Sequence, residues 1–173
     1  AMFCGRLVPE KAPDQLIKAF LNVPGDAQLA IVGDSAGTDD YTQQLKALAQ
    51  NDPRIIFTGY QYGETLHQLF ANAWCYATTS RLEGLPLTLL EAMSFGLPVV
   101  VSDIGPHVEA TRINPACGLE FPVENIPAAT QALTDVFAWT PEQRQTASQV
   151  SIEIVQTHFG WEGIADKTLE VMN

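Results

Sequence analysis

The sequence contains two glutamates separated by seven residues, Glu83 and Glu91. Carboxylates at this spacing could bind a ligand or take part in catalysis. Glu83 precedes Pro86, a residue typical of a helix start, and the apolar run that follows predicts a helix over residues 86–95 with Glu91 in its middle. At about 1.5 Å per residue, Glu91 lies roughly 7–8 Å along the helix axis from Pro86. Two carboxylates around a positively polarised helix end predict a site for a polar ligand with an anionic centre.

Two cations and the helix start could bind that anionic centre. Arg6 and Lys11 are two of only nine basic residues, and they could clamp a diphosphate, Arg6 through its planar fork and Lys11 as a point charge. On residue types alone, solvated surface cations are the more frequent arrangement. Because Pro86 has no N–H group, a phosphate at the helix start would be bound by the N–H groups of its neighbours, unless this is a plain loop-to-helix transition. These neighbours are Gly84, Leu85 and Leu87.

Alternating strand and helix patterns predict the scaffold that positions these residues. Strands are expected over residues 3–7, 27–33, 54–58, 73–78 and 99–102, with a short sixth strand at 119–122. Helices are expected over residues 14–21, 38–50, 63–71, 86–95, 127–137, 141–157 and 161–172. Several strands are apolar throughout, which is typical of a parallel sheet covered on both faces. The sequence therefore predicts an α/β fold, a Rossmann-like doubly wound parallel sheet of about six strands with helices on both faces.

The carboxyl ends of the strands are the expected ligand-binding edge of such a sheet. The loops that should meet there cover residues 6–11, 33–37, 59–63, 80–85 and 103–107. Gly33, Gly59 and Tyr60 end strands at this edge, and we expect them to line a base pocket, mostly through their backbone groups. We therefore expect the glutamates, the cations and a candidate base pocket to lie together at this edge of the sheet.

Size and composition narrow the class of protein. The 173 residues suit a single domain, and a net charge of −11 disfavours a nonspecific nucleic-acid binder. No apolar run approaches the roughly 18 residues of a transmembrane helix, and no signal peptide is visible. Cys4, Cys75 and Cys117 are odd in number and set among apolar residues, so we expect buried free thiols in a cytoplasmic protein.

Other kinds of active site find less support. His67, His107 and His158 are far apart, lack metal-ligand spacing and are expected to be ordinary surface or loop residues, so no metal site is predicted. No G-x-G-x-x-G motif and no Walker A loop is present, which leaves NAD and P-loop chemistry without support and no cofactor predicted. The two glutamates could serve a glycosidase, but a hydrolase would not require the neighbouring cations.

Five segments, in the same order, resemble the retaining, glycogen-synthase-like glycosyltransferases of GT-B fold, known as group 1. The most specific is E-G-L-P-L-T-L-L-E at residues 83–91, with the family's E-x7-E spacing. The others are GRLVPEKAPDQLIKAF from Gly5, IVGDS from Ile31, IFTGY from Ile56 and GLPVVVSDIG from Gly96. The resemblance covers most of the chain, from Gly5 to about Lys167.

The resemblance implies a role for each candidate residue. Arg6, Lys11 and the helix start at residues 84–87 would bind the phosphates of a nucleoside-diphosphate sugar, without a metal ion. Glu91 would accept hydrogen bonds from the ribose hydroxyls, and Glu83 would be the catalytic carboxylate, touching the donor sugar and stabilising positive charge at its anomeric carbon. Two departures from the family are Ala12 in place of a common glycine, and P-H-V-E at residues 106–109 in place of its frequent Gly-(Gly/Ile)-Pro-Glu segment.

The resemblance also implies a larger enzyme. Residues 1–173 would be its C-terminal, donor-binding domain, and an N-terminal domain absent from this chain would bind the acceptor, a carbohydrate or a lipid-linked sugar. The full enzyme would be cytoplasmic or peripheral at the inner membrane, and this fragment alone inactive or poorly active. The alternatives are half of a GT-B nucleotide-sugar epimerase or phosphorylase, or a non-enzymatic module that binds a nucleotide sugar.

Overall fold

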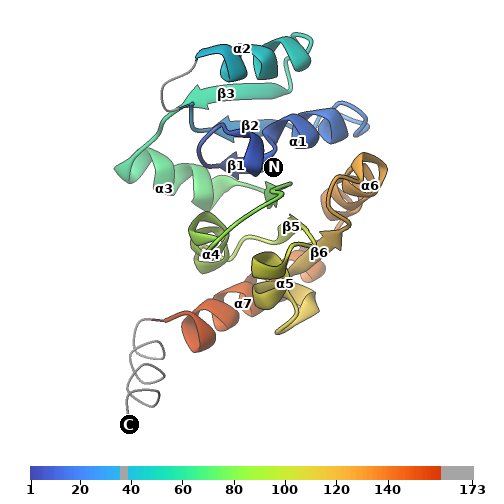
Figure 1. Ribbon diagram of the computed structural model, residues 1–173. Helices are drawn as coiled ribbons and strands as arrows, with labels where there is room; N and C mark the ends of the chain where they lie inside the picture. Colours follow the sequence, from blue (N-terminus) through green and yellow to red (C-terminus); the bar gives the residue numbers. More distant parts are fainter. Residues whose placement is uncertain (36–38, 161–173) are drawn as a thin grey trace.

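The computed structural model describes residues 1–35 and 39–160, in which six strands alternate with helices (Figure 1). The helix expected over residues 161–172 lies outside the described residues. The strands are β1 (Met2–Cys4), β2 (Leu29–Val32), β3 (Ile55–Gly59), β4 (Tyr76–Thr78), β5 (Val99–Ser102) and β6 (Gly118–Phe121). The helices are α1 (Pro13–Phe20), α2 (Asp39–Leu48), α3 (Gly63–Asn72), α4 (Leu87–Ser94), α5 (Gly105–Thr111), α6 (Ile126–Phe137) and α7 (Pro141–His158), with 3-10 turns η1 (Pro9–Lys11) and η2 (Pro115–Cys117).

The six strands form one parallel sheet in the order β3-β2-β1-β4-β5-β6. Met2 on β1 is in register with Ala30 on β2 and with Tyr76 on β4, so β1 lies at the centre of the sheet. The order reverses at β1 and β4, because the chain first builds outward from β1 to β3 and then returns to build outward from β4 to β6. This arrangement confirms the predicted Rossmann-like, doubly wound α/β fold.

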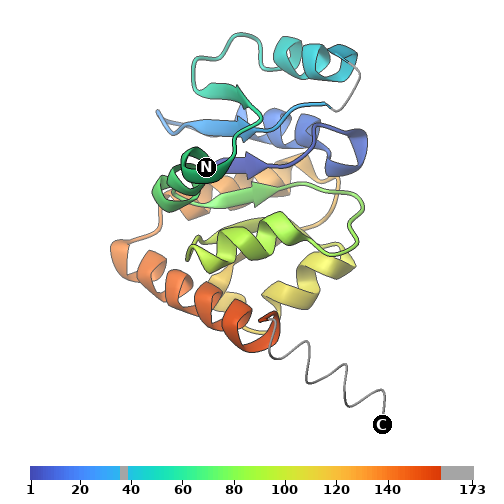
Figure 2. The same ribbon diagram turned by 90° about the vertical axis from the view of Figure 1, so that its left-hand side faces the viewer.

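Each face of the sheet is covered by helices that contribute apolar side chains to a separate core. On one face, Leu16 of α1 and Leu133 of α6 belong to a cluster with Phe3 of β1. On the other face, Leu89 of α4 and Ile154 of α7 pack with β-strand side chains in a second cluster. Figure 2 shows α3 and α4 in front of the sheet, with α1 and α6 behind it. Burial on both faces explains why β5 is apolar throughout except for its final serine.

Several predicted boundaries were wrong. The structure has only three residues in β1 and three in β4, where the sequence predicts five and six. The predicted helix at residues 86–95 begins at Leu87, because Pro86 adopts φ −81° and ψ 67° and is the N-cap. The stretch after β5, where a loop is predicted over residues 103–107, contains α5, which begins at Gly105 with a proline in its first turn. Local patterns thus located most of the elements but not their ends.

Candidate functional site

The loops after β1 and β4 are joined at the point where the strand order reverses. The chain after β1 passes through η1 to α1 on one face, whereas the chain after β4 enters α4 on the other. The backbone N–H of Arg81 donates to the carbonyl of Glu10 at 2.8 Å, and the Thr79 hydroxyl donates to the carbonyl of Ala12 at 2.8 Å. These bonds fix the two loops against each other, at the edge where doubly wound sheets bind ligands.

Lys11 and Glu83 meet across this junction. The Lys11 ammonium donates to both carboxylate oxygens of Glu83, at 2.6 Å to Oε1 and 2.5 Å to Oε2. The Glu83 side chain is only 8% exposed and that of Lys11 21% exposed, so water screens this pair little. The hydroxyl of Ser80 also donates to Glu83 Oε1, at 2.9 Å. The structure therefore brings together two residues that the sequence placed 72 positions apart.

Ala12 shapes the turn that presents Lys11. Its φ of 48° and ψ of 41° lie in the left-handed region, and its N–H donates to the carbonyl of Pro9 at 3.1 Å. A residue with a Cβ atom adopts this conformation at some energetic cost, which glycine avoids. The turn is thus built with alanine, and the departure from glycine at this position does not remove it.

Arg6, after β1, and Glu91, on α4, carry charged groups without a partner among the described residues. Within residues 1–35 and 39–160, neither side chain makes a hydrogen bond or an ion pair with another side chain or with the backbone. Arg6 is exposed just after β1, and Glu91 is half-buried on α4. Glu91 lies near Cys4 at the end of β1, since burial and then the charge of Glu91 raise the pKa of the Cys4 thiol to about 11. A cation and a carboxylate are therefore available to bind a ligand at this edge.

The start of α4 offers fewer backbone donors than the sequence predicts. The N–H of Leu87 donates to the carbonyl of Leu85 at 2.9 Å, closing a γ-type turn around Pro86. The N–H groups of Gly84 and Leu85 make no backbone hydrogen bond within the described residues. Of the three predicted donors, Gly84 and Leu85 therefore lack a backbone partner among the described residues, and Leu87 has one.

Gly33, Gly59 and Tyr60 lie together at the same edge, on the β2 and β3 side. The N–H of Gly33 donates to the carbonyl of Gly59 at 2.9 Å, and the Tyr60 hydroxyl donates to the carbonyl of Asp34 at 3.0 Å. The Tyr60 ring stacks on Tyr62, with ring centroids 6.1 Å apart, and both rings are exposed. The structure thus groups these residues and adds an aromatic surface that the sequence analysis did not single out.

His107 is buried, so its prediction as a surface or loop residue was wrong. Its ring is 0% exposed, and Nδ1 lies 2.9 Å from the carbonyl oxygen of Ser102. Because a carbonyl only accepts, Nδ1 carries the proton, which leaves Nε2 as an acceptor, and within the described residues Nε2 has no hydrogen-bond partner. Burial lowers the pKa of the imidazole. Polar residue type suggested exposure here, but His107 lies on the buried side of helix α5.

The lowered pKa of His107 predicts a stability that depends on pH. Below its usual pKa of about 6.5, the unfolded chain binds a proton at this histidine and the folded chain does not. The free energy of unfolding should therefore fall from pH 7 to pH 5, by at most about 1.4 kcal/mol per pH unit. Urea unfolding at several pH values should give a flatter profile for His107→Gln, whereas His67→Gln, which alters an exposed ring, should keep the wild-type slope.

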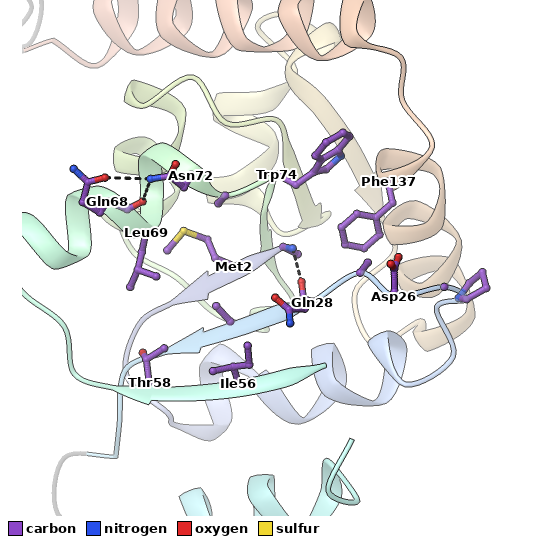
Figure 3. A pocket seen from close by; sticks show the side chains of 16 residues that line it. Met2, Asp26, Gln28, Ile56, Thr58, Gln68, Leu69, Asn72, Trp74 and Phe137 are labelled. Atoms are coloured by element: carbon purple, nitrogen blue, oxygen red, sulfur yellow. Dashed lines mark hydrogen bonds between the residues drawn. The ribbon is translucent and has the colours of Figure 1, made fainter. Parts of the chain in front are cut away.

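A large cavity in the described part of the chain lies away from these residues. It is an open hollow of about 700 Å³ near the starts of β1 and β2, beside α3 (Figure 3). Met2, Leu69, Trp74 and Phe137 supply apolar walls. None of the residues predicted for the ligand site lines it. In the same part of the chain, no group of three or more His, Cys, Asp or Glu residues is placed to hold a metal ion, and no helix is long and apolar enough to span a membrane.

A comparison with protein families identifies the chain. The family model described as glycosyl transferases group 1 matches residues 1–150. The chain belongs to the group 1 glycosyl transferases. A glycogen synthase of Deinococcus radiodurans is 29% identical over 96% of this chain and 36% of its own length. A lipopolysaccharide 1,6-galactosyltransferase of Salmonella typhimurium is 33% identical over 59% of this chain and 29% of its own length.

Solved structures of similar proteins share the fold. A sucrose-phosphate synthase from Thermosynechococcus elongatus superposes with a TM-score of 0.86 and 28% identity, over 99% of this chain and 44% of its own. HepE of Anabaena, solved in complex with UDP and glucose, gives a TM-score of 0.86 at 24% identity, over 99% of this chain and 47% of its own. This group 1 chain therefore spans less than half the length of these relatives. The family resemblance and the GT-B type fold inferred from the five segments are confirmed.

Proposed function

We propose that this chain is the donor-binding domain of a retaining glycosyltransferase, which transfers a sugar from a nucleoside diphosphate to an acceptor hydroxyl. One observation carries the proposal: Lys11 and Glu83 meet where the strand order reverses. Arg6 follows β1 and Glu91 lies on α4, and among the described residues neither side chain has a partner. Opposite charges at this point suit a ligand that carries both phosphates and hydroxyl groups.

The diphosphate would bind between the cations and the start of α4. Arg6 can donate two parallel hydrogen bonds to phosphate oxygens, and Lys11 supplies a second positive charge. The free N–H groups of Gly84 and Leu85 add neutral donors beside the helix. These groups would neutralise the charge that develops on the departing diphosphate, and we expect no further metal ion or cofactor to be required.

The two glutamates would bind the sugar portions of the donor. Glu91, which has no internal hydrogen-bond partner in the described residues, would accept hydrogen bonds from the ribose hydroxyls. Glu83 would contact the transferred sugar. As the bond between the anomeric carbon and the diphosphate oxygen breaks, the electron pair leaves with the diphosphate, and the Glu83 carboxylate stabilises the positive charge left on the sugar. The carbonyl and ring groups at Gly33, Gly59 and Tyr60 would border the base.

Acceptor binding would belong to another part of a longer enzyme. The relatives are more than twice as long as the aligned region, and three of them are named for different products or transfers: a glycogen synthase, a lipopolysaccharide 1,6-galactosyltransferase and a sucrose-phosphate synthase. We infer that an N-terminal domain binds the acceptor, a carbohydrate or lipid-linked sugar. This chain alone should therefore bind donor without efficient transfer.

Replacing Glu91 by glutamine should weaken binding of a ribonucleoside diphosphate by about ten- to a hundredfold. The neutral amide of glutamine would not form the charge-assisted hydrogen bonds that the carboxylate accepts from ribose, each of which contributes about 1.5–3 kcal/mol. Calorimetric titration of UDP, GDP and ADP into the wild type would first identify the preferred base. UDP is the natural starting point, because the Anabaena relative was solved with UDP. The same titration with the 2′-deoxynucleotide should show little difference between wild type and Glu91→Gln.

The control is Glu153→Gln, which alters an exposed carboxylate on α7, away from the strand edge. It should bind nucleotides as tightly as the wild type. If Glu91→Gln kept its full preference for ribo- over deoxyribonucleotides, Glu91 would not be the ribose contact. If the wild type bound none of the nucleotides or their sugar conjugates, the donor-site proposal would fail for this chain.

A further inference from the structure

Ser80 holds Glu83 by a hydrogen bond that neither the motif nor the family assignment predicts. It lies two residues after the end of β4 and is 0% exposed, and its hydroxyl donates to Glu83 Oε1 at 2.9 Å. An ionised carboxylate has no proton to give, so the hydrogen in this bond must come from the serine. Charge-assisted bonds of this kind are about twice as strong as neutral ones and strongly directional. Ser80 therefore constrains the position of the Glu83 carboxylate.

Ser80 is itself held by buried polar neighbours. Its hydroxyl lies 3.0 Å from that of Thr78, and since the Ser80 proton is given to Glu83, the Thr78 hydroxyl is the donor. The Ser80 carbonyl accepts from the Ser102 hydroxyl at 2.7 Å. The Ser102 carbonyl in turn accepts from His107 Nδ1 at 2.9 Å. All four side chains are at most 2% exposed, so this network ties the ends of β4 and β5 to helix α5.

The network matters if Lys11 leaves Glu83 when a diphosphate binds. In the structure, Glu83 is held by Lys11 and by Ser80. If Lys11 turns toward a diphosphate, as the proposed function requires, Ser80 is the remaining side chain among the described residues that donates to this carboxylate. We propose that Ser80 is a positioning residue that keeps Glu83 directed at the donor sugar while Lys11 engages the diphosphate. This inference rests on the proposed function.

The test compares a nucleoside diphosphate with its sugar conjugate on the same chain. Glu83 contacts the sugar only, so Ser80→Ala should lower the affinity for UDP-glucose relative to UDP by about tenfold and leave the affinity for UDP itself nearly unchanged. GDP and GDP-mannose replace this pair if the wild type prefers guanine. A purely structural role would change both affinities together. Ser80→Thr retains the hydroxyl and should restore most of the relative affinity.

The matched control is Ser151→Ala on α7. Ser151 is also 0% exposed, and its hydroxyl donates to the carbonyl of Leu97 at 3.0 Å. This variant loses a comparable buried hydrogen bond outside the site, so it should lose stability without changing the ratio of the two affinities. Ser80→Cys, whose thiol is a weaker donor than the hydroxyl, provides a second variant if Ser80→Ala does not fold, and it should lower the ratio by a smaller factor.

The outcomes separate the inference from the function on which it rests. A lower ratio in Ser80→Ala, restored in Ser80→Thr and unchanged in Ser151→Ala, supports the positioning role. A ratio equal to that of the wild type in Ser80→Ala, or in Ser80→Cys if the alanine variant does not fold, overturns it while the donor-site proposal stands. A wild type that binds neither nucleotide nor conjugate refutes the donor site itself, and the positioning role with it.

Discussion

Lys11→Met should weaken the binding of a nucleoside diphosphate by about ten- to a hundredfold. The methionine preserves the length of the side chain but removes the ammonium that would contact the phosphates, a charged hydrogen bond that contributes about 1.5–3 kcal/mol. It also leaves Glu83, 8% exposed, without its cation, so the free energy of unfolding should fall by about 1–3 kcal/mol. Calorimetry and urea unfolding measure the two effects separately.

Glu83→Gln should have the opposite effect on the nucleoside diphosphate. In the free chain the Lys11 ammonium is bound at 2.5 and 2.6 Å by the Glu83 carboxylate, and a phosphate must compete with that carboxylate. Glutamine releases the ammonium, so the plain diphosphate should bind about fivefold more tightly, while the advantage of a sugar conjugate over the plain diphosphate is lost.

Lys18→Met is the matched control for both variants. Lys18 also forms an ion pair, with Asp14 at 3.0 Å, but one turn apart on α1. Its removal should leave nucleotide affinity unchanged. If Lys11→Met and Glu83→Gln weakened diphosphate binding equally, the pair would act as a structural link between two loops, and the competition between carboxylate and phosphate would be refuted.

Gly33→Ala should destabilise the fold by about 3 kcal/mol or more. Gly33 has φ +132°, and a Cβ atom placed there would lie 1.9 Å from the carbonyl oxygen of Gly5. Neither atom can move freely, because the N–H of Gly5 bonds to β2 and that of Gly33 bonds to Gly59. The substitution must therefore push apart the ends of β1 and β2, beside which the predicted diphosphate and base contacts lie. We expect lower soluble yield and a lower urea midpoint.

Gly25→Ala separates the steric effect from the backbone strain. Gly25 also has a positive φ, of 90°, but no atom lies within 4 Å of the position that its Cβ would take. Strain alone should reduce the free energy of unfolding by about 1–2 kcal/mol. If Gly33→Ala were no less stable than Gly25→Ala, the loops after β1 and β2 would have room to separate, and the tight contact would not matter to the fold.

The sequence by itself determined the fold class and most of the elements. Apolar strands at regular intervals between helices require a parallel sheet covered on both faces, and these patterns are local. The E-x7-E segment and the cations after the first strand likewise identified Glu83, Glu91, Arg6 and Lys11 as candidates, because their residue types and neighbours are visible in one dimension. The structure leaves their roles toward a donor as predictions.

Only the tertiary structure decided which candidates meet and which polar groups are buried. The contact between Lys11 and Glu83 exists because β1 and β4 are neighbours, and sequence spacing does not encode strand order. Ser80 looks like an ordinary loop serine and His107 like a surface histidine, yet both are fully buried. Burial depends on what the rest of the chain places over a residue. The network that holds Glu83 depends on tertiary contacts, such as the one between His107 of α5 and the Ser102 carbonyl at the end of β5.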